Sequence, residues 1–278
     1  TRRKDITDCH GYRHHPVRRQ MQLPLPAVYD KIRSETTLGG CRMTERESDK
    51  EKLRDQLFSV LYQAGAALVG TADLKEVIKG RLCTGVSVAV PVPAHIVEDL
   101  KTAPTMEYYN MYNALNARLD RIVLTGAGFL KDRGFNAMAN TTETVEKDEN
   151  WRTPLPHKTV ATRAGLGWIG KSCLLVTEEY GSAVRLSSLI TDAPLPVGIP
   201  IDQSRCGKCQ ICVKSCPAGA LKGTLWARDT EREEIFVKEE CKKTQIERMR
   251  QATGIETDLC GLCFAVCPYT QRYLKRGR

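Results

Sequence analysis

The sequence lacks a long hydrophobic run, a secretory leader pattern and a basic stripe interleaved with aromatic residues. No apolar stretch approaches the ~18 residues that a membrane-spanning helix needs, so no membrane span is expected. The basic start at Arg2, Arg3 and Lys4 is not followed by an apolar segment, so no secretory signal is expected either. The composition is otherwise ordinary for a soluble globular chain, with 41% hydrophobic and 27% charged residues.

The net charge of +9 belongs to the two ends of the chain. Residues 1–42 carry nine Lys/Arg against four Asp/Glu, and residues 272–278 carry four basic residues and no acid, whereas residues 43–271 have 29 of each sign. Basic ends of this kind are typical of solvated tails. Nucleic acid is therefore not an expected partner.

Periodicity and composition divide the chain into three parts. Residues 1–42 show no sustained period and are expected to be a basic, poorly ordered extension. Residues 43–200 alternate helix and strand patterns, and residues 201–278 are rich in cysteine, so we expect an α+β cofactor or substrate domain followed by a cysteine module. The patterns predict helices over residues 49–64, 105–124 and 157–164, and strands over residues 67–70, 86–90, 173–177 and 183–191.

Twelve cysteines are the main departure from an ordinary composition. The run Cys206-x2-Cys209-x2-Cys212-x3-Cys216-Pro217 has the spacing of bacterial ferredoxins, in which three cysteines wrap one cluster and the fourth binds the other. A second run begins at Cys260 and lacks one cysteine, which Cys241 can supply. Two [4Fe–4S] clusters are predicted, the first held by Cys206, Cys209, Cys212 and Cys267, and the second by Cys216, Cys241, Cys260 and Cys263.

Zinc and disulfides are the alternatives for these thiols. Two CxxC pairs can bind zinc, but the run from Cys206 to Cys216 is too crowded for one tetrahedral ion. Disulfides need an oxidising compartment, whereas iron–sulfur clusters favour the cytoplasm. The other cysteines, Cys9, Cys41, Cys83 and Cys173, follow no pattern and are interpreted as packing or exposed thiols.

A glycine-rich segment imitates a nucleotide-binding loop. Residues 165–172 satisfy both G-x-x-x-x-G-K-[ST] and G-x-G-x-x-G. Both motifs require a strand before the loop and a helix after it, because the phosphate sits at the helix N-terminus. Here the patterns predict a helix before and a strand after, so the segment is interpreted as a bend in which glycines permit close approach of a cofactor or of another backbone.

The stretch from Lys158 to Val176 resembles the signature of epoxyqueuosine reductases, which are relatives of the reductive dehalogenases. Gly181 and Ser182, and then the segment from Thr191 to Leu195, stand where that family carries matching residues, and the cysteine module follows directly. The resemblance spans about residues 49–271. It implies a nitroreductase-like α/β sandwich that binds cobalamin, joined to a two-cluster module that reduces the cobalt.

The resemblance also has departures. Aligned on the motif, Trp151 occupies the position of the family's proton-donating aspartate, and the nearest acids are Asp148 and Glu149. The sequence ends shortly after the cysteine module, so we expect a short form without the helical repeats of the full-length reductases. The substrate is therefore not expected to be epoxyqueuosine.

Candidate site residues follow from the resemblance and from the need for a proton source beside the metal. Without the aspartate, the catalytic candidates are Tyr108, Tyr109, Tyr112 and His157, with His95 as a weaker candidate. The residues expected to contact the cofactor are His157, Lys158, Gly165, Gly167, Trp168, Gly170, Lys171, Gly181 and Ser182. Lys171 either contacts a corrinoid phosphate or carboxamide or faces solvent.

Two classes of function stay open from the sequence. In the first, the chain is a reductase, cobalamin-dependent as the resemblance implies, that draws electrons from a donor such as ferredoxin or flavodoxin and acts on a small-molecule or corrinoid substrate. In the second, it is an electron-transfer protein or a reductive activator of a corrinoid partner, without catalysis of its own. An acid-lined cavity beside the clusters would distinguish the first class from the second.

Overall fold

The computed structural model describes residues 45–276, and the extension predicted over residues 1–42 lies outside this range. The described residues belong to one compact unit. The predicted division near residue 200 therefore stays a prediction about modules of the sequence. None of the described helices combines the length and the apolar character needed to cross a membrane.

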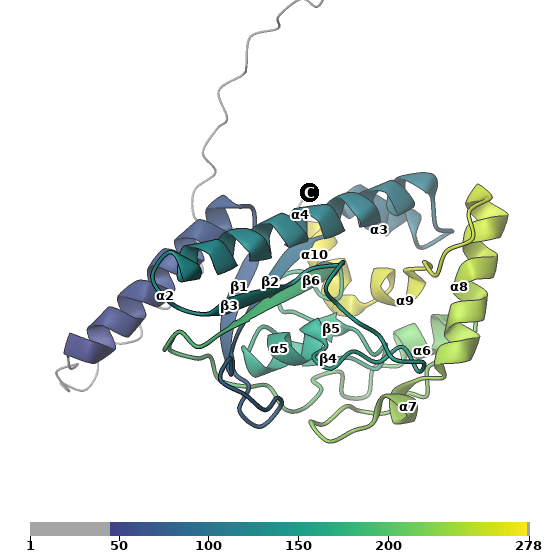
Figure 1. Ribbon diagram of the computed structural model, residues 1–278. Helices are drawn as coiled ribbons and strands as arrows, with labels where there is room; N and C mark the ends of the chain where they lie inside the picture. Colours follow the sequence, from purple (N-terminus) through teal and green to yellow (C-terminus); the bar gives the residue numbers. More distant parts are fainter. Residues whose placement is uncertain (1–44, 277–278) are drawn as a thin grey trace, which may run out of the picture. The chain divides into compact units, whose positions relative to one another are not determined.

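A four-stranded antiparallel sheet forms the centre of this unit (Figure 1). Strands β1 (Leu68–Asp73) and β2 (Thr84–Pro91) pair with each other, and β2 pairs with β6 (Val184–Thr191). The short strand β3 (Ala137–Asn140) closes the other edge, which gives the order β1-β2-β6-β3. All neighbours are antiparallel, so the described fold is α+β, as predicted. The narrower nitroreductase-like assignment stays a prediction.

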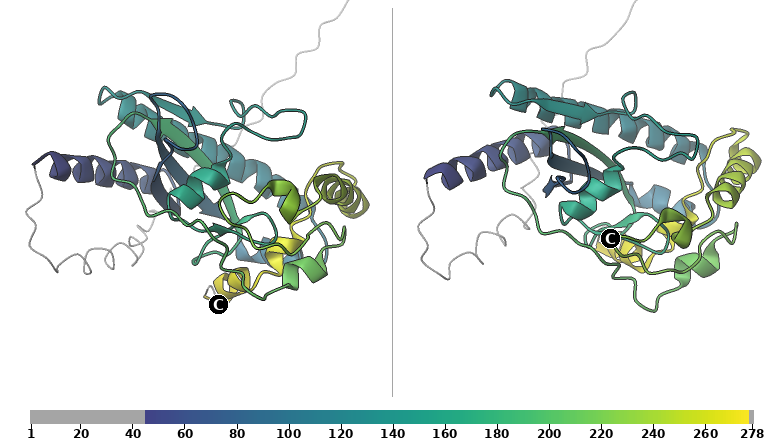
Figure 2. Two further views of the ribbon diagram at one scale, coloured as in Figure 1. Left: turned by 90° about the horizontal axis from the view of Figure 1, so that it is seen from below. Right: turned by 60° about the horizontal axis from the view of Figure 1, so that its bottom comes forward.

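Helices cover both faces of the sheet. The helices α2 (Glu45–Gln63) and α4 (Met106–Lys131) pack together on one face, and α5 (His157–Arg163) packs on the other (Figure 2). The strand period of two explains why the sheet has a separate core on each face, because neighbouring side chains of β6 point to opposite faces. Leu189 joins the core under α4, whereas the next residue, Ile190, joins the smaller core under α5.

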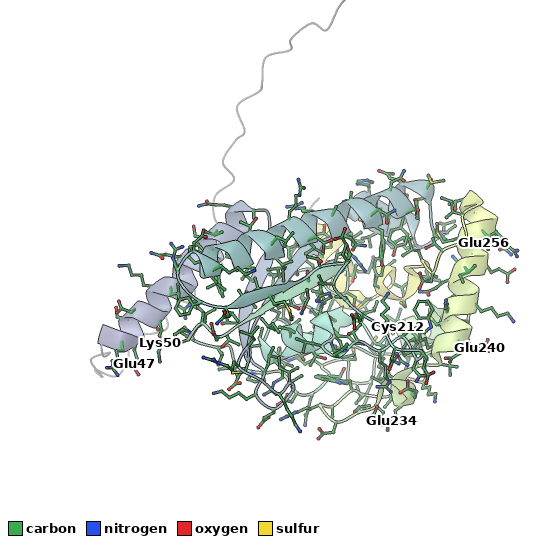
Figure 3. The ribbon with its side chains drawn as sticks, viewed as in Figure 1. Glu47, Lys50, Cys212, Glu234, Glu240 and Glu256 are labelled. Atoms are coloured by element: carbon green, nitrogen blue, oxygen red, sulfur yellow. The ribbon has the colours of Figure 1, made fainter. Side chains whose placement is uncertain are left out.

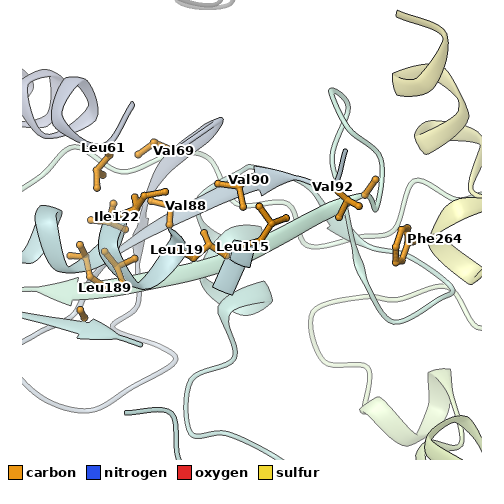
Figure 4. Packing of buried hydrophobic residues seen from close by; sticks show 14 of the residues in the cluster. Leu61, Val69, Val88, Val90, Val92, Leu115, Leu119, Ile122, Leu189 and Phe264 are labelled. Atoms are coloured by element: carbon orange, nitrogen blue, oxygen red, sulfur yellow. The ribbon is translucent and has the colours of Figure 1, made fainter. Parts of the chain in front are cut away.

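The large core lies between α4 and the sheet (Figure 4). Helix α4 begins at Thr105, whose hydroxyl accepts a hydrogen bond from the Tyr108 backbone N–H at 3.1 Å. Gly126 lets the helix approach its neighbours closely, since a Cβ there would come within 2.8 Å of Leu61 and 2.9 Å of Leu189. Leu115, Leu119 and Ile122 fill the same interface.

The cysteine module consists of short helices joined by turns, with one longer helix, α8 (Lys238–Thr253). A short hairpin lies between α5 and this module in the sequence. Its two strands, β4 (Trp168–Ile169) and β5 (Leu175–Val176), have two residues each. The remaining helices are α3 (Ala94–Asp99), α6 (Ile211–Ser215), α7 (Arg232–Ile235), α9 (Leu262–Ala265) and α10 (Pro268–Arg276).

The expected elements are present, with corrected bounds. The helix predicted over residues 105–124 continues to Lys131, and the strand predicted over residues 173–177 shortens to β5, since Cys173 has a positive φ of 60° in the hairpin turn. The order of helix, glycine bend and hairpin around residues 157–176 agrees with the rejection of a nucleotide-binding loop. Helix α8 escaped prediction because Met249 is its one buried residue, which leaves no apolar period.

Candidate iron–sulfur centre and acceptor site

The cysteines of the module fall into two groups in space. Burial, and after it the nearby thiols of Cys267, Cys206 and Cys209, together raise the pKa of Cys212 to about 11. These are the four thiols that the sequence spacing assigns to the first cluster, and we call them the first cysteine set. In the second cysteine set, burial and the neighbours Cys216 and Cys260 raise the pKa of Cys241 to about 11 in the same way.

The two sets lie next to each other. Burial raises the pKa of Cys263, as do the charges of Cys260 and Cys241 from its own set and of Cys212 from the first set. All ten cysteines of the described residues are free of disulfide bonds. Within residues 45–276, no group of three or more His, Cys, Asp or Glu side chains converges closely enough to hold a single metal ion. The grouping of the thiols matches the ligand sets that the sequence spacing assigns to iron–sulfur clusters.

The start of helix α10 supports the first cysteine set. Burial raises the pKa of Cys267, whereas hydrogen bonds from the backbone N–H groups of Thr270 and Tyr269 and from the Ser182 hydroxyl lower it. A helix N-terminus presents unpaired N–H groups, so it favours a thiolate there. Ser182 is itself anchored, because its backbone N–H donates to Thr270 Oγ1 at 3.0 Å. The Ser182 Oγ has no oxygen or nitrogen partner and is directed to the sulfur.

Lys171 is buried against the loop of the first cysteine set. Its side chain is 3% exposed, and its Nζ donates to the carbonyl oxygens of Gly207 at 2.9 Å and of Cys209 at 3.0 Å. A buried ammonium without a partner charge is costly in an ordinary core. Beside thiolate-ligated iron–sulfur clusters, which carry net negative charge, the same ammonium is favourable. The sequence left Lys171 between a corrinoid contact and solvent, and the structure places it at the cluster loop instead.

Trp168 is packed beside the same set. Its side chain is fully buried, and its ring meets the edge of the Tyr269 ring at a centroid distance of 4.9 Å. Its Nε1–H has no hydrogen-bond partner among the described residues. Gly170, two residues further on, is so close to the set that a Cβ there would lie 3.5 Å from Cys206 Sγ. An unpartnered donor at this place is what a cluster sulfur would satisfy.

The other glycines of the motif meet this chain's own backbone. A Cβ at Gly167 would clash with the Val176 carbonyl oxygen across the hairpin, and one at Gly165 would lie 2.5 Å from the Ile199 carbonyl oxygen. Gly181 has a φ of 59°, and a Cβ there would clash with the backbone of Thr270. Of the two alternatives left open by the sequence, close approach of another backbone describes these positions. A bulky residue at Gly167 would therefore disturb the hairpin itself.

Lys158 lies near the second cysteine set. Its Nζ donates to the Cys173 carbonyl oxygen at 3.1 Å and contacts Cys173 Sγ at 3.2 Å. Cys173 is buried and close enough to Cys241 to influence its pKa. The extra cysteine without a sequence pattern thus belongs to the packing around the second set, and Lys158 holds the turn that carries it.

A second polar region adjoins the second cysteine set on the α4 side of the sheet. Tyr108 is 6% exposed, and this burial raises the pKa of its hydroxyl above the usual range. The charge of Arg185 lowers the pKa of Tyr108, whereas the charges of Cys263 and Cys260 raise it further. Its ring centroid lies 6.3 Å from that of Phe264, the residue that follows Cys263. Tyr108 therefore stands between the second set and Arg185.

Arg185 is the centre of this region. Its guanidinium donates to Asn116 Oδ1 at 2.7 Å and lies 4.0 Å from the centre of the Tyr112 ring. The edge strand β3 pairs only with residues 188–191 of β6, so it does not cover Arg185. We call Arg185, Tyr108, Tyr112, Asn116 and His157 the acceptor site.

His157 belongs to α5, on the other face of the sheet, where the charge of Arg185 still reaches it and it is a neutral imidazole. Its Nδ1 lies 2.9 Å from Ser188 Oγ. Burial and the charge of Arg185 lower its pKa to about 4, and Asp120 opposes the shift. Asp120 accepts hydrogen bonds from the backbone N–H and the hydroxyl of Thr142, which fixes its carboxylate. His157 thus fits a hydrogen-bonding role near neutral pH better than that of a charged proton donor.

The sequence analysis named Tyr108, Tyr112 and His157 but missed Asn116 and Arg185. Tyr108, Tyr112, Asn116 and Asp120 follow each other at steps of four along α4, which places them on one face of the helix. The apolar positions of that helix were the ones used to predict it, and a search for polar residues at the same spacing would have found this row. Tyr109 lies off the row and packs against the large core.

The position of the family's aspartate is occupied differently. Trp151 is 45% exposed and has a φ of 60°, and the ammonium groups of Lys242 and Lys238 lie 3.6 Å and 4.2 Å from its ring centre. Asp148, one of the nearest acids, accepts the Arg152 backbone N–H at 2.7 Å. This loop therefore fastens to α8 and presents no carboxylic acid at that position.

The His157 environment predicts a pH-dependent stability. The unfolded imidazole binds protons below its ordinary pKa of 6.5, whereas the folded one binds them only near pH 4, so stability falls as the pH decreases through this window. From this group alone we expect the free energy of unfolding to fall by about 2 kcal/mol between pH 7 and pH 5. Denaturant titrations of the His157→Asn variant should lack this part of the slope.

His95→Asn is the matched control for that measurement. The His95 side chain is 64% exposed and pairs with Glu107 at 3.0 Å, so its replacement should leave the slope unchanged. An identical pH dependence in the wild type and in His157→Asn would contradict the assigned environment.

Comparisons with known proteins agree with the resemblance inferred from the motif. Residues 205–270 match the family described as "4Fe-4S double cluster binding domain". Epoxyqueuosine reductase from Pseudomonas aeruginosa is 35% identical over 118 residues, which cover 42% of this chain and 32% of that protein. The chain thus spans about a third of the length of this curated relative.

Solved structures share the fold. A reductive dehalogenase, whose structure is described as suggesting a mechanism for B12-dependent dehalogenation, aligns with a TM-score of 0.60 and 17% identity over 87% of this chain and 35% of that one. An epoxyqueuosine reductase in complex with an epoxyqueuosine-modified tRNA stem loop aligns with a TM-score of 0.52 and 23% identity over 79% and 66%. The chain is therefore similar to iron–sulfur oxidoreductases. Because this second neighbour binds RNA, the expectation that nucleic acid is not a partner stays a prediction.

Proposed function

We propose that the chain is an iron–sulfur oxidoreductase that passes electrons through two [4Fe–4S] clusters to an acceptor bound beside Arg185. The observation that carries the proposal is the position of Tyr108, which is close enough to Cys263 and Cys260 on one side and to Arg185 on the other to feel the charges of both. Arg185 also influences His157, so one cation joins the groups of the acceptor site.

The order of transfer follows from the adjacency of the two sets. Cys212 of the first set influences Cys263 of the second, so electrons can pass from one cluster to the other without leaving the protein. The second cluster is the one that adjoins the acceptor site. With both clusters bound, the first set would receive the electrons and the second set would deliver them beside Tyr108. We also propose a cytoplasmic location, since such clusters do not persist in an oxidising compartment.

A corrinoid is the acceptor that we propose for this site. The glycines of the motif do not fit a corrin ring, because backbone atoms already occupy the space beside them. The acceptor site does fit the ring's polar periphery, since Asn116 and His157 offer neutral hydrogen-bonding groups and Arg185 a cation for a phosphate. When bound, a corrinoid would supply a cobalt centre that accepts low-potential electrons.

The residues of the site would have distinct tasks. Arg185 is held by Asn116 and by the Tyr112 ring, so it can orient an anionic group without moving. Tyr108 keeps its proton throughout the neutral pH range, because burial raises the pKa of its hydroxyl. Its Oη–H therefore serves as a fixed hydrogen-bond donor. His157 remains neutral and offers Nε2, while its Nδ1 stays with Ser188.

The test is a titration of hydroxocobalamin into anaerobic protein whose clusters are full. We expect the cobalamin absorption spectrum to shift on binding to the wild type. In Arg185→Met the dissociation constant for cobalamin should rise by about 10-fold or more, because a charge-assisted contact is lost. Arg133→Met is the control, since Arg133 lies 3.6 Å from the Phe129 ring within the same helix region and outside the acceptor site. No shift in wild-type protein with full clusters would contradict the corrinoid proposal.

The second candidate is an electron-transfer protein without catalysis. Trp151 favours it, because the residue at the place of the family's proton donor is fastened between lysines of α8. The same observation supports the proposal that epoxyqueuosine is not the substrate. Under this candidate the acceptor beside Arg185 would be a group on a partner, and the cobalamin titration would be silent while cluster reduction remained normal.

A further inference from the structure

Positive charge gathers around the first cysteine set. Neither residues 203–228 nor residues 260–276, the two segments that supply this set, contain an Asp or a Glu. Eight exposed basic side chains lie in these segments, and six of them are within nine residues of a cysteine of the first set. We call these six the basic face: Arg205, Lys208, Lys214, Arg272, Lys275 and Arg276.

The basic residues of α10 lie on its solvent-exposed side. Thr270 and Leu274 are buried, and they lie four residues apart on one side of the helix. The three basic residues of α10, from Arg272 to Arg276, lie on the opposite side at helical spacing. Cys267 directly precedes α10 and receives its first N–H groups, so these cations lie on the exposed side of a helix that begins at the first set.

The other basic residues join this group through packed aromatic rings. Arg205 lies 5.4 Å from the centre of the Trp168 ring, and Arg272 lies 4.6 Å from that of Tyr269. Since these two rings contact each other, the two arginines flank one aromatic pair. Glu178 pairs with Arg205 at 3.4 Å, which offsets only part of the charge. The buried ammonium of Lys171 adds to the positive field beneath the loop.

The segment that supplies Cys241 of the second set carries the opposite balance, whereas Cys216, Cys260 and Cys263 come from the acid-free segments. Residues 229–258, which include α7, α8 and Cys241, contain nine acidic and six basic residues. Figure 3 labels three of these acids, Glu234 on α7, Glu240 on α8 and Glu256 just after α8. Helix α8 itself carries five basic and three acidic residues, so the acidic excess lies before it, over residues 229–234, and after it, over residues 256–258. An anionic partner would be attracted to the basic face and repelled from these two acidic segments.

We infer that the basic face is the docking surface for a small acidic electron-carrier protein, which delivers electrons to the first cluster. The inference rests on the proposed function and adds the place and the partner class. Charge complementarity of this kind mainly sets the rate of encounter and the orientation of the complex. RNA is the less suitable partner, because Trp168 is fully buried and Tyr269 half-buried, which leaves no exposed ring of this pair for base stacking.

The test measures reduction of the clusters by reduced flavodoxin in a stopped-flow spectrometer at low ionic strength. We expect the double variant Lys208→Glu/Lys214→Glu to slow the second-order rate by about 10-fold or more, and added salt to slow the wild type towards it. The control is Lys50→Glu/Lys52→Glu on α2; Figure 3 shows Lys50 well apart from Cys212. The control should keep the wild-type rate.

Reduction by excess titanium(III) citrate distinguishes failure of the proposed function from failure of the docking inference. If this reductant fails to reduce the wild type, the proposed function fails and the docking inference falls with it. If it reduces every variant but flavodoxin reacts equally with the wild type, the double variant and the control, the docking inference alone is overturned. It is also overturned if the double variant loses binding to an RNA stem loop while its flavodoxin rate is unchanged.

Discussion

Replacing Cys241 with serine is expected to remove the second cluster and to leave the first in place. Cys241 neighbours Cys216 and Cys260 of the second set, and after burial these two thiols contribute most to its raised pKa. With four thiolates per cluster, the iron content of anaerobic protein should fall from about eight to about four per chain. Electron paramagnetic resonance of the reduced protein should show one cluster signal without the coupling between two.

Cys83→Ser is the matched control for this variant. Cys83 is half-buried and belongs to neither cysteine set, so its loss should leave the iron content unchanged. If the Cys241 variant kept both clusters, the fourth ligand of the second set would be a different residue. If it lost both, the two sets would fold as one cooperative unit around the metal.

Replacing Lys171 with methionine is expected to lower the reduction potential of the first cluster. The variant removes a buried positive charge next to the loop of that cluster, so the reduced and more negative state loses stabilisation. It also leaves the carbonyl oxygens of Gly207 and Cys209 without their donor. Losing these charge-assisted hydrogen bonds should lower the free energy of unfolding by about 2–4 kcal/mol.

A redox titration followed by electron paramagnetic resonance separates the two effects. The second cluster serves as an internal reference, because it should keep its potential in Lys171→Met. Lys171→Arg keeps the charge, so it should restore most of the potential even where the larger side chain costs stability. An unchanged potential in a folded Lys171→Met protein that retains both clusters would show that Lys171 is a structural residue only.

The helices and strands that position the sites can be predicted from the sequence wherever the element has one apolar face. The helix before the glycine bend and the strand β6 after it were expected within one or two residues. Together they identified the segment around Gly165 as a bend and not as a phosphate loop. Helix α8 was not accessible, because a surface helix with Met249 as its one buried residue has no apolar period.

The roles of the motif residues were less accessible, because they depend on partners far away in the sequence. Lys171 contacts carbonyl groups 36 and 38 residues further on, and Gly181 meets Thr270. Such contacts leave no local signal, and so a conspicuous motif was interpreted as a cofactor cradle. In the structure the same motif supports the first cysteine set. The cysteines themselves were easier, since ligand type and short spacing are local properties.

The acceptor site also depends on contacts between residues far apart in the sequence, so the sequence identified its members only one by one. His157 and Tyr108 were candidates because a reductase needs a proton source, but nothing in the sequence joined them. The charge of Arg185 reaches both of them, and Arg185 lies in a segment for which the sequence pattern predicted only a strand. A charged residue inside a predicted strand next to an expected cofactor domain was the available signal.

The most direct test of the whole account is the iron and acid-labile sulfide content of anaerobically purified protein. Eight cysteines in two sets predict about eight irons and about eight sulfides per chain, with little zinc. Zinc at about one or two per chain with little iron would contradict the account, because neither the path to Arg185 nor the basic face would then have electrons to carry.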